Sequence, residues 1–558
     1  MSRTGSQILI DVLKEENVEY IFGLPGGVVI PFFDTLFDSD LKFILTRHEQ
    51  AAGHAADGYA RATGKVGVCL VTSGPGATNL TTAIATASMD SIPMVAITGQ
   101  VKTHLIGSDA FQEADVTGIT RSISKHNYLV KDIKELGTVV KEAFYIASTG
   151  RPGPVVIDLP VDVTTDTWDG DIPEKINLPG YKPAYEGNIR QIKIAAEAIN
   201  RSKRPVVYAG GGVISSNSSE QLIELAEKAN LPVNTTLLAL GVFPEDNEKA
   251  LGMLGMHGTV PANYAVHESD LLIAIGARFD DRITGKIDEF APQAQIIHID
   301  IDPTSISKNI RVDIPVVGDA GNILTELIKH VNPVERKEWL EKISEWKEKY
   351  PLTYNNANDD VKPQYVVEQI CQATKGKAII TTEVGQNQMW AAQFYTYTNP
   401  RSFLSSGGLG TMGFGFPAAI GAQLGCPDKI VIAIAGDGSF QMNIQELSTA
   451  VNYKLPVKVA ILNNGYLGMV RQWQELFYNK RYSHTRLSGN PDFVQVAKAY
   501  GAEGFLVEKK EDVRPVIEKS ISIDGPVVID FRVSPEENVF PMIPAGQAIS
   551  QIKGVEII

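Results

Sequence analysis

The chain has 558 residues, of which 44% are hydrophobic and 21% charged, and its formal net charge is −14. This composition suits a globular protein of several domains, and the acidic balance argues against nucleic acid as a main partner. Cys69, Cys371 and Cys426 are far apart and predict neither disulfides nor a zinc site. The sequence has no signal core and no apolar run long enough to cross a membrane, so we expect a cytoplasmic protein.

Short apolar strands alternate with helical segments along the whole chain. This alternation predicts an α/β protein whose parallel sheets are flanked by helices. Two stretches, 164–187 and 331–361, are rich in proline, glycine or charged residues and interrupt the alternation. They predict three domains, at residues 1–165, 188–335 and 362–545.

In the first segment, LTRHEQAAGHAADGYARATG (45–64) predicts a strand followed by a helix, with Glu49 at the junction. The carboxyl end of a parallel strand is where α/β folds bind ligands, so Glu49 is a candidate catalytic acid. An acidic residue in the first turn of a helix is also a common partner of the helix dipole. Position alone leaves both interpretations open.

A strand, a Gly-rich turn, a helix and a second strand entered through proline occur twice in the chain. One copy is VGVCLVTSGPGATNLTTAIATASMDSIPMVAITG in the first segment, and the other is KIVIAIAGDGSFQMNIQELSTAVNYKLPVKVAILNNG in the third. The separation is 20 residues both from Ser73 to Pro93 and from Gly436 to Pro456. Because βαβ units are common, chance is the alternative, but the shared proline favours duplication of one domain.

The middle segment predicts a sheet of its own, and Gly210-Gly211-Gly212 follows one of its strands. Such a turn lets the backbone approach a phosphate closely, although a glycine triplet also occurs in turns without a ligand. Asp300 ends the strand QIIHID, where acidic residues of dinucleotide-binding folds bind a ribose hydroxyl. These features predict a nucleotide site, and a simple tight turn is the alternative.

Two short motifs in the third segment, Gly436-Asp437-Gly438 and Asn463-Asn464, have 24 residues between them. Each follows a predicted strand, so their side chains reach the same carboxyl edge of a sheet. The helix expected from about Ser439 offers unpaired N–H groups to a phosphate. A carboxylate and an amide oxygen beside a phosphate suit Mg²⁺, and a Gly-Asp-Gly turn with a helix cap is the alternative.

The paired motifs resemble the diphosphate–metal motif of thiamine-diphosphate enzymes, and the chain as a whole resembles acetohydroxyacid synthase catalytic subunits. The resemblance runs from Gly5 to about Pro544, and its most specific parts are RFDDR (278–282) and Trp473. It implies a pyrimidine-binding first domain, an FAD-binding, Rossmann-like middle domain and a third domain that binds diphosphate and Mg²⁺. The segments that carry it are HEQAAGHAADGYARATG, SGPGATN, GRPGPVVIDLP, GARFDDR, GLGTMGFGFPAAIGA, GDGSFQMNIQEL and NNGYLGMVRQWQ.

The resemblance also implies which residues hold the cofactors. Glu49 would activate the pyrimidine ring, while Asp437, Asn464 and the backbone carbonyl of Tyr466 would bind Mg²⁺. Met412 would support the bent cofactor, with a core methionine as the alternative. Thiamine diphosphate would further contact Gln386, Gly436, Gly438, Ser439 and Met469. FAD would contact Arg151, Gly211, Gly212, Met256, His257, Arg278, Asp300 and Asp319.

Four further residues match substrate positions. Gln112 would lie near the reacting carbonyl, and Phe111 would line the substrate pocket. Arg282 would bind the carboxylate of a second 2-keto acid, with a surface ion pair inside RFDDR as the alternative. Trp473 would favour an ethyl over a methyl group on that acid. The chain departs from the resemblance at Asn387, where we expect histidine, and the asparagine would still donate a hydrogen bond to the diphosphate.

The implied activity decarboxylates pyruvate on thiamine diphosphate and transfers the hydroxyethyl unit to pyruvate or 2-ketobutyrate. The products, 2-acetolactate and 2-aceto-2-hydroxybutyrate, lead to branched-chain amino acids. FAD would be structural, because the net reaction transfers no electrons. The active site would form between the subunits of a homodimer or a dimer of dimers, which a small regulatory subunit would bind. The alternatives are a flavin-free catabolic acetolactate synthase, a pyruvate oxidase and a nucleotide-binding protein without catalysis.

Overall fold

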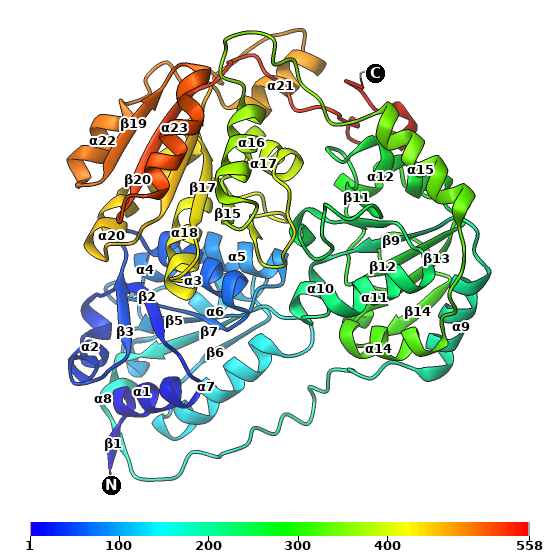
Figure 1. The fold of residues 1–558 in the computed structure, drawn as a ribbon. Helices are drawn as coiled ribbons and strands as arrows, with labels where there is room; N and C mark the ends of the chain where they lie inside the picture. The colour runs from blue at the N-terminus through cyan, green and yellow to red at the C-terminus, as the bar shows by residue number, and fades with distance from the viewer. Residues whose placement is uncertain (1, 556–558) are drawn as a thin grey trace.

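The fold is that of a computed structural model, which describes residues 2–555. Three sheets of six strands, each flanked by helices, make up most of the chain (Figure 1). Every pairing within these sheets is parallel, as between β4 and β5, β9 and β12, and β17 and β18. The α/β fold of parallel sheets predicted from the sequence is therefore confirmed.

The first sheet has the strand order β3-β2-β4-β5-β7-β6. Its central strands are buried along their whole length, which explains why their sequences are continuously apolar. Its strands are β2 (Tyr20–Leu24), β3 (Lys42–Leu45), β4 (Gly67–Val71), β5 (Met94–Gln100), β6 (His126–Leu129) and β7 (Pro154–Pro160). Its helices are α1 (Gly5–Glu15), α2 (Ile30–Phe37), α3 (Glu49–Thr63), α4 (Pro75–Asn79), α5 (Thr81–Asp90), α6 (Val116–Thr120), α7 (Ile133–Ser148) and α8 (Val161–Thr165). A short antiparallel ribbon joins β1 (Arg3–Thr4) to β8 (Thr167–Trp168).

The third sheet has the order β16-β15-β17-β18-β20-β19. If the strands of each sheet are numbered one to six along the chain, both sheets have the order 2-1-3-4-6-5. This confirms that the first and third domains share one plan. The strands are β15 (Ile379–Thr382), β16 (Phe403–Leu404), β17 (Val431–Gly436), β18 (Lys458–Asn463), β19 (Glu503–Val507) and β20 (Val527–Arg532). The helices are α16 (Pro363–Thr374), α17 (Gln386–Phe394), α18 (Gly415–Gly425), α19 (Asp437–Phe440), α20 (Leu447–Asn452), α21 (Gly468–Phe477), α22 (Phe493–Tyr500) and α23 (Lys510–Ile521).

The middle sheet has the order β11-β10-β9-β12-β13-β14, which is the strand order of dinucleotide-binding folds. The Rossmann-like topology predicted for this domain is present. The strands are β9 (Pro205–Ala209), β10 (Val233–Thr235), β11 (Ala250–Met253), β12 (Leu271–Ile275), β13 (Gln295–Asp300) and β14 (Ile314–Val317). The helices are α9 (Ile189–Arg201), α10 (Gly211–Ser215), α11 (Ser219–Ala229), α12 (Val260–Glu268), α13 (Asp281–Thr284) and α14 (Ala320–His330). Helix α15 (Lys337–Lys349) follows the predicted end of this domain at residue 335, yet its Trp339 and Ile343 are buried in the same hydrophobic cluster as Tyr208 of β9.

The helix predicted from about Ser439 is not continuous. It is divided into α19, a 3-10 helix from Gln441 to Glu446, and α20. Asn443 causes the break, because its backbone leaves the helical region (φ −133°, ψ 30°) and its side chain donates a hydrogen bond to the Gly413 carbonyl at 2.6 Å. The prediction of one helix is therefore wrong, since a contact distant in sequence overrides the local pattern.

The first and third domains pack directly on one another, with the middle domain beside them (Figure 1). Their closest contact joins α3 to α18 through small residues. A Cβ atom added to Gly421 would overlap the carbonyl oxygen of Ala55, and one added to Gly58 would overlap that of Ala418. Glycine therefore lets the two helix backbones approach much more closely than helices with larger side chains can.

Replacing Gly421 with alanine should lower the stability of the protein. The added methyl group has to displace the α3 backbone, and overpacking of this kind costs about 1–3 kcal/mol or more. Thermal unfolding of Gly421→Ala should begin at a lower temperature than that of the wild type. Gly180→Ala is the matched control, because a Cβ atom at that position would have no described atom within 4 Å beyond its chain neighbours. Equal melting temperatures for the two variants would contradict the close packing.

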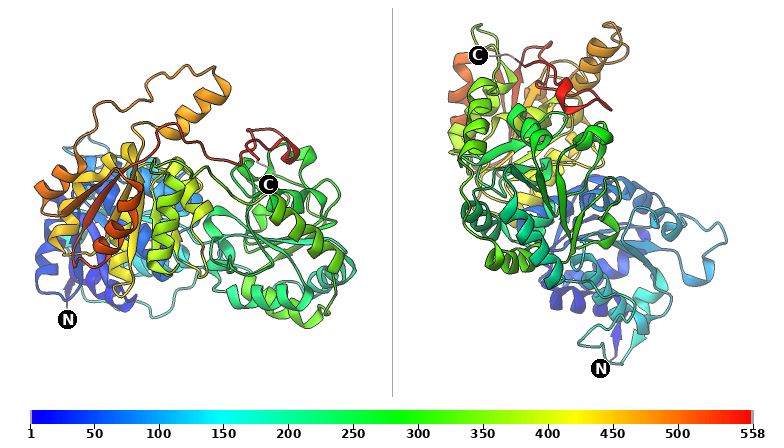
Figure 2. Two further views of the ribbon diagram at one scale, coloured as in Figure 1. Left: turned by 45° about the horizontal axis from the view of Figure 1, so that its top comes forward. Right: turned by 90° about the vertical axis from the view of Figure 1, so that its right-hand side faces the viewer.

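Long segments connect the domains. The segment 169–188 runs along the outside from the first domain to the middle one, and the last part of the chain returns from the third domain to the middle domain (Figure 2). There the backbone N–H of Ile543 donates to the carbonyl of Met256 at 2.8 Å. Within residues 2–555, we find no helix with the length and apolar character needed to span a bilayer.

Candidate active site

A cavity of about 860 Å³ lies between the middle and third domains, with part of its rim formed by the first. It collects predicted site residues that are up to about 320 positions apart in the sequence, so the fold brings distant motifs together. The predicted residues that line it are Arg151, Gly211, Gly212, Met256, His257, Arg278, Arg282, Asp300, Asp319, Gln386, Met412, Gly436, Asp437, Gly438, Ser439, Asn464, Tyr466, Met469 and Trp473.

Asp437 and Asn464 lie at one corner of this cavity. Strands β17 and β18 pair with Gly436 opposite Leu462, so the residues that follow them emerge at the same edge of the sheet. Oδ2 of Asp437 accepts a hydrogen bond from Asn490 at 2.5 Å, whereas its Oδ1 is buried and has no hydrogen-bond partner among the described residues. Burial raises the pKa of Asp437 to about 6. A buried, unpartnered carboxylate oxygen at this position is what a cation would satisfy.

The rest of this corner also suits Mg²⁺. Oδ1 of Asn464 accepts the backbone N–H of Tyr466 at 3.0 Å, and its Nδ2 donates to Gln386 Oε1 at 3.1 Å, so the amide is held in a fixed orientation. The described residues contain no cluster of three or more His, Cys, Asp or Glu side chains that could hold a metal. Mg²⁺ needs no such cluster, because it takes one or two protein carboxylates together with phosphate oxygens and water.

The Asn387 side chain does not donate toward this corner. Its Nδ2 donates to the carbonyls of Glu383 at 3.0 Å and Ile434 at 3.1 Å, which uses both N–H groups. Its Oδ1 faces Gly436 instead, 3.4 Å from where a Cβ atom would stand. The prediction that Asn387 donates to a diphosphate is therefore wrong for this arrangement, because two backbone carbonyls take both donors.

Arg282 and Trp473 meet at another part of the cavity, although they come from different domains. The guanidinium carbon of Arg282 lies 5.7 Å from the centre of the Trp473 ring, within the range of cation–π attraction. The Arg282 side chain is 53% exposed, and its ion pair with Asp281 is long, at 3.8 Å. The guanidinium group can therefore still donate hydrogen bonds to an anion. Burial, and then the charge of Arg282, lower the pKa of neighbouring His257 to about 4, so this histidine is neutral at physiological pH.

The middle domain contributes the long side of the cavity. Gly212 packs against Gly276 so closely that a Cβ atom added to Gly212 would stand 2.6 Å from the Cα of Gly276. A Cβ atom added to Gly211 would have no atom of the described residues within 4 Å beyond its chain neighbours. The glycine triplet therefore makes a tight turn and also leaves one open backbone position. Asp300 accepts the N–H of Asp302 at 2.8 Å, and Asp319 caps α14. Both carboxylates keep acceptor capacity toward the cavity.

Three predicted residues lie outside this cavity, and all three belong to the first domain. Glu49 begins α3, is 8% exposed and accepts a hydrogen bond from Asn79 at 2.9 Å. Gln112 is half-buried with φ +58°, and its carbonyl lies 2.7 Å from where a Cβ of Gly74 would stand. Phe111 is 87% exposed. Glu49 and Gln112 thus flank the segment 73–79, which includes α4, and lie outside the 860 Å³ cavity.

Comparison with known proteins agrees with this arrangement. Residues 3–119 match the family "Thiamine pyrophosphate enzyme, N-terminal TPP binding domain", residues 192–327 its central domain, and residues 383–531 its C-terminal TPP binding domain. An acetolactate synthase of Mycobacterium bovis is 52% identical over 99% of this chain and 91% of its own length. The chain belongs to the acetolactate synthase large-subunit family.

Two more relatives extend the comparison to distant organisms. A probable acetolactate synthase large subunit of Methanocaldococcus jannaschii is 52% identical, over 98% of this chain and 95% of its own. An acetolactate synthase large subunit of Haemophilus influenzae is 47% identical over 98% of both chains. The resemblance drawn from the sequence motifs is confirmed, and the three-domain plan of thiamine pyrophosphate enzymes is confirmed with it.

Within this acetolactate synthase fold, the sequence reasoning missed several residues that support the site. Asn490 holds Asp437 Oδ2, and Gln441 donates to Asn490 Oδ1 at 2.9 Å. The buried side chain of Gln472 accepts from Gln386 at 2.9 Å. No local pattern marks these amides, because they act through contacts between distant segments. Glu383 could have been found from the sequence, because it follows a strand and precedes a glycine, as Asp437 does.

Proposed function

We propose that the chain is the catalytic subunit of an acetolactate synthase, which decarboxylates pyruvate and joins the remaining two-carbon unit to pyruvate or 2-ketobutyrate. The observation that carries this proposal is the single cavity in which the Asp437–Asn464 corner faces Arg282 and Trp473. One part of that cavity has the donor set for a metal-bound diphosphate, and another has a cation beside an apolar ring. A 2-keto acid has a carboxylate and an alkyl group to match the second part.

The residues of the third domain fit thiamine diphosphate and Mg²⁺. Oδ1 of Asp437, Oδ1 of Asn464 and the carbonyl of Tyr466 would hold the metal. Bound thiamine diphosphate supplies the electron sink needed to break the bond to the carboxylate of a 2-keto acid. Its contacts would be made by Gln386, Met412, Gly436, Gly438, Ser439 and Met469.

FAD would occupy the side of the cavity formed by the middle domain. The strand order of that domain and the open backbone at Gly211 support a dinucleotide. Because the net reaction transfers no electrons, we assign FAD a structural role. Its further contacts would be Arg151, Gly212, Met256, His257, Arg278, Asp300 and Asp319, all of which line the cavity.

A second copy of the chain would complete the site. Glu49, Gln112 and Phe111 lie away from the chain's own cavity, and a two-fold dimer would bring them to the cavity of the partner. We assign the domains to residues 1–165, 188–335 and 362–545, with Glu49 of the first activating the cofactor bound by the third. The two relatives named as large subunits support a smaller regulatory partner for this chain as well.

Arg282 would bind the carboxylate of the second keto acid, and Trp473 would contact its alkyl group. Replacing Trp473 with leucine should therefore lower the preference for 2-ketobutyrate over pyruvate, by about 10–200-fold for one methylene contact. The ratio of the two products in mixed-substrate reactions measures this preference. Phe477→Leu is the control, since Phe477 lies on the same helix, 6.4 Å from Trp473 between ring centres, but does not line the cavity. An unchanged product ratio in Trp473→Leu would remove the assigned role.

The proposed activity is tested with purified protein, Mg²⁺, thiamine diphosphate, FAD and pyruvate. We expect 2-acetolactate to form, and chelation of Mg²⁺ to stop its formation. Release of CO₂ without acetolactate would contradict the proposal. Bleaching of the flavin by pyruvate at the catalytic rate would indicate an oxidase instead, and a colourless active protein would indicate the flavin-free catabolic enzyme.

A further inference from the structure

The loop 406–413 connects β16 to α18 and carries Met412 to the cavity. All three domains meet at its start. A Cβ atom at Gly407 would stand 2.9 Å from Leu238 of the middle domain, and one at Gly408 would stand 2.8 Å from Asp90 of the first. The position of this loop is therefore set partly by residues outside its own domain.

Asp90, the last residue of α5, accepts two backbone hydrogen bonds from the loop. The N–H of Gly407 donates to its Oδ2 at 3.1 Å, and the N–H of Gly408 donates to its Oδ1 at 2.7 Å. The Asp90 side chain is fully buried. Hydrogen bonds to an ionised carboxylate are about twice as strong as neutral ones, so this contact fixes the loop more firmly than packing alone would.

Arg61 of α3 keeps Asp90 in place. One guanidinium nitrogen of Arg61 lies 2.8 Å from Oδ2 of Asp90, and another lies 2.5 Å from Oδ1 of Asp57. A third donates to the carbonyl of Ser405 at 2.8 Å, and the Phe414 ring centre lies 5.1 Å away. A single cation of the first domain thus contacts the third domain on both sides of the loop.

The far end of the loop is held as well. Glu383 accepts the N–H groups of Gly413 at 2.6 Å and Phe416 at 3.1 Å. Between the two ends, Thr411 of the loop and Thr86 of α5 share a hydrogen bond of 2.8 Å between their hydroxyl oxygens. Met412 is therefore placed by one carboxylate of its own domain and one carboxylate of the first domain.

We propose that Asp90, held by Arg61, is a positioning residue for the cofactor site. By fixing Gly407 and Gly408 it sets the place of Met412 in the cavity. This inference rests on the proposed function, since it takes the cavity to be the thiamine diphosphate site. Helix α3 would then contribute at both ends. Its first residue is the candidate acid Glu49, and Arg61, about 18 Å further along the helix, supports the loop of the chain's own cavity.

Two variants test the inference through different physical changes. Asp90→Asn keeps the shape of the side chain but removes its charge, and it leaves Arg61 paired with Asp57. Gly408→Ala changes no charge but adds a methyl group 2.8 Å from Oδ1 of Asp90, which pushes the loop away.

Tyr453→Phe is the matched control for these variants. The Tyr453 hydroxyl accepts the N–H of Leu45 at 2.8 Å and donates to the carbonyl of Phe43 at 3.2 Å. Removing that hydroxyl loosens the contact between the same two domains at a place that does not line the cavity.

The measurements are the affinity of the Mg²⁺-supplemented full chain for thiamine diphosphate and the rate of hydrogen–deuterium exchange at C2 of the bound cofactor. FAD content and melting temperature report whether each variant is folded. We expect affinity and exchange to fall by about tenfold or more in Asp90→Asn and Gly408→Ala, and by less than about twofold in Tyr453→Phe. If affinity and exchange in both variants equal those of the control, the inference about Asp90 is overturned, while the proposed function is not affected. A wild-type chain that binds no thiamine diphosphate would overturn the proposed function, and this inference with it.

Discussion

Replacing Asp437 with asparagine should lower both the affinity for Mg²⁺ and the rate of acetolactate formation by more than about a hundredfold. One oxygen of the carboxylate accepts a hydrogen bond from Asn490, and the other is buried and has no hydrogen-bond partner within residues 2–555. An asparagine could present a neutral oxygen or an N–H₂ group to the cation, but no negative charge. Titration of the purified protein with Mg²⁺, followed by turnover at saturating Mg²⁺, measures the two effects separately.

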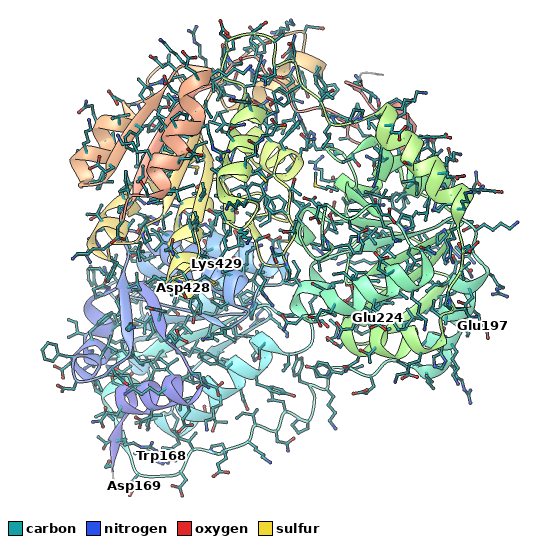
Figure 3. All side chains as sticks on the ribbon, viewed as in Figure 1. Trp168, Asp169, Glu197, Glu224, Asp428 and Lys429 are labelled. Atoms are coloured by element: carbon teal, nitrogen blue, oxygen red, sulfur yellow. The ribbon has the colours of Figure 1, made fainter. Side chains whose placement is uncertain are left out.

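Asp428→Asn is the matched control for this substitution. Asp428 is exposed and precedes β17 (Figure 3). Asp437 follows the same strand, so each variant removes one negative charge from one end of it. The control should keep the Mg²⁺ affinity of the wild type. The Mg²⁺ affinity of Asn490→Ala should lie between those of Asp437→Asn and Asp428→Asn, because loss of a residue that orients a metal ligand costs about 10–100-fold in affinity. Similar affinities in Asp437→Asn and Asp428→Asn would place the metal elsewhere.

The sequence was sufficient to predict that Asp437 and Asn464 lie together at one edge of a sheet, because their placement depends on local rules. A Gly-Asp-Gly turn and an Asn pair each follow a strand, and parallel strands deliver such residues to one edge. The repeat of strand, turn, helix and proline likewise predicted that the first and third domains are alike. The strand orders agree because the same chain pattern folds twice in the same way.

Contacts between distant segments could not be predicted from the sequence pattern. The donors of Asn387 are taken by the carbonyls of Glu383 and Ile434, and the helix after Ser439 breaks where Asn443 reaches Gly413. In both cases a polar side chain has several possible partners nearby, and only the packed fold decides which of them it meets. The loop contacts of Asp90 arise in the same way, since α5 is more than 300 residues from Gly407 in sequence.

Each domain contributes a different part of the cavity or of its support. The third domain supplies Asp437 and Asn464, and the middle domain supplies Arg282 and the side of the cavity lined by Gly211 and Gly212. The first domain supports the loop of the chain's own cavity through Arg61 and Asp90 and lines it with Arg151, while Glu49, Gln112 and Phe111 lie outside that cavity. A domain that supports one site and presents Glu49 away from it is expected when two copies complete one another's sites.

Glu49→Gln should lower the rate of acetolactate formation by at least about a hundredfold while leaving the binding of thiamine diphosphate and Mg²⁺ nearly unchanged. Glutamine keeps the hydrogen bond from Asn79 but cannot exchange a proton with the cofactor. Glu15→Gln is the control, because Glu15 is an exposed glutamate of the same domain, at the end of α1. Turnover and cofactor affinity measured on the same preparations distinguish a chemical role for Glu49 from a binding role.

Mixing two inactive variants tests whether Glu49 acts on the partner's cavity. In a hybrid of Glu49→Gln and Asp437→Asn chains, one site contains both substitutions and the other contains neither. Random pairing makes half of the dimers hybrids with one intact site, so co-refolded variants should recover about a quarter of the wild-type activity. If Glu49 served the cavity of its own chain, every site in the hybrid would carry one substitution and no activity would return. Recovery near a quarter therefore requires that Glu49 of one copy meets Asp437 of the other, and its absence in verified hybrids would refute the shared site.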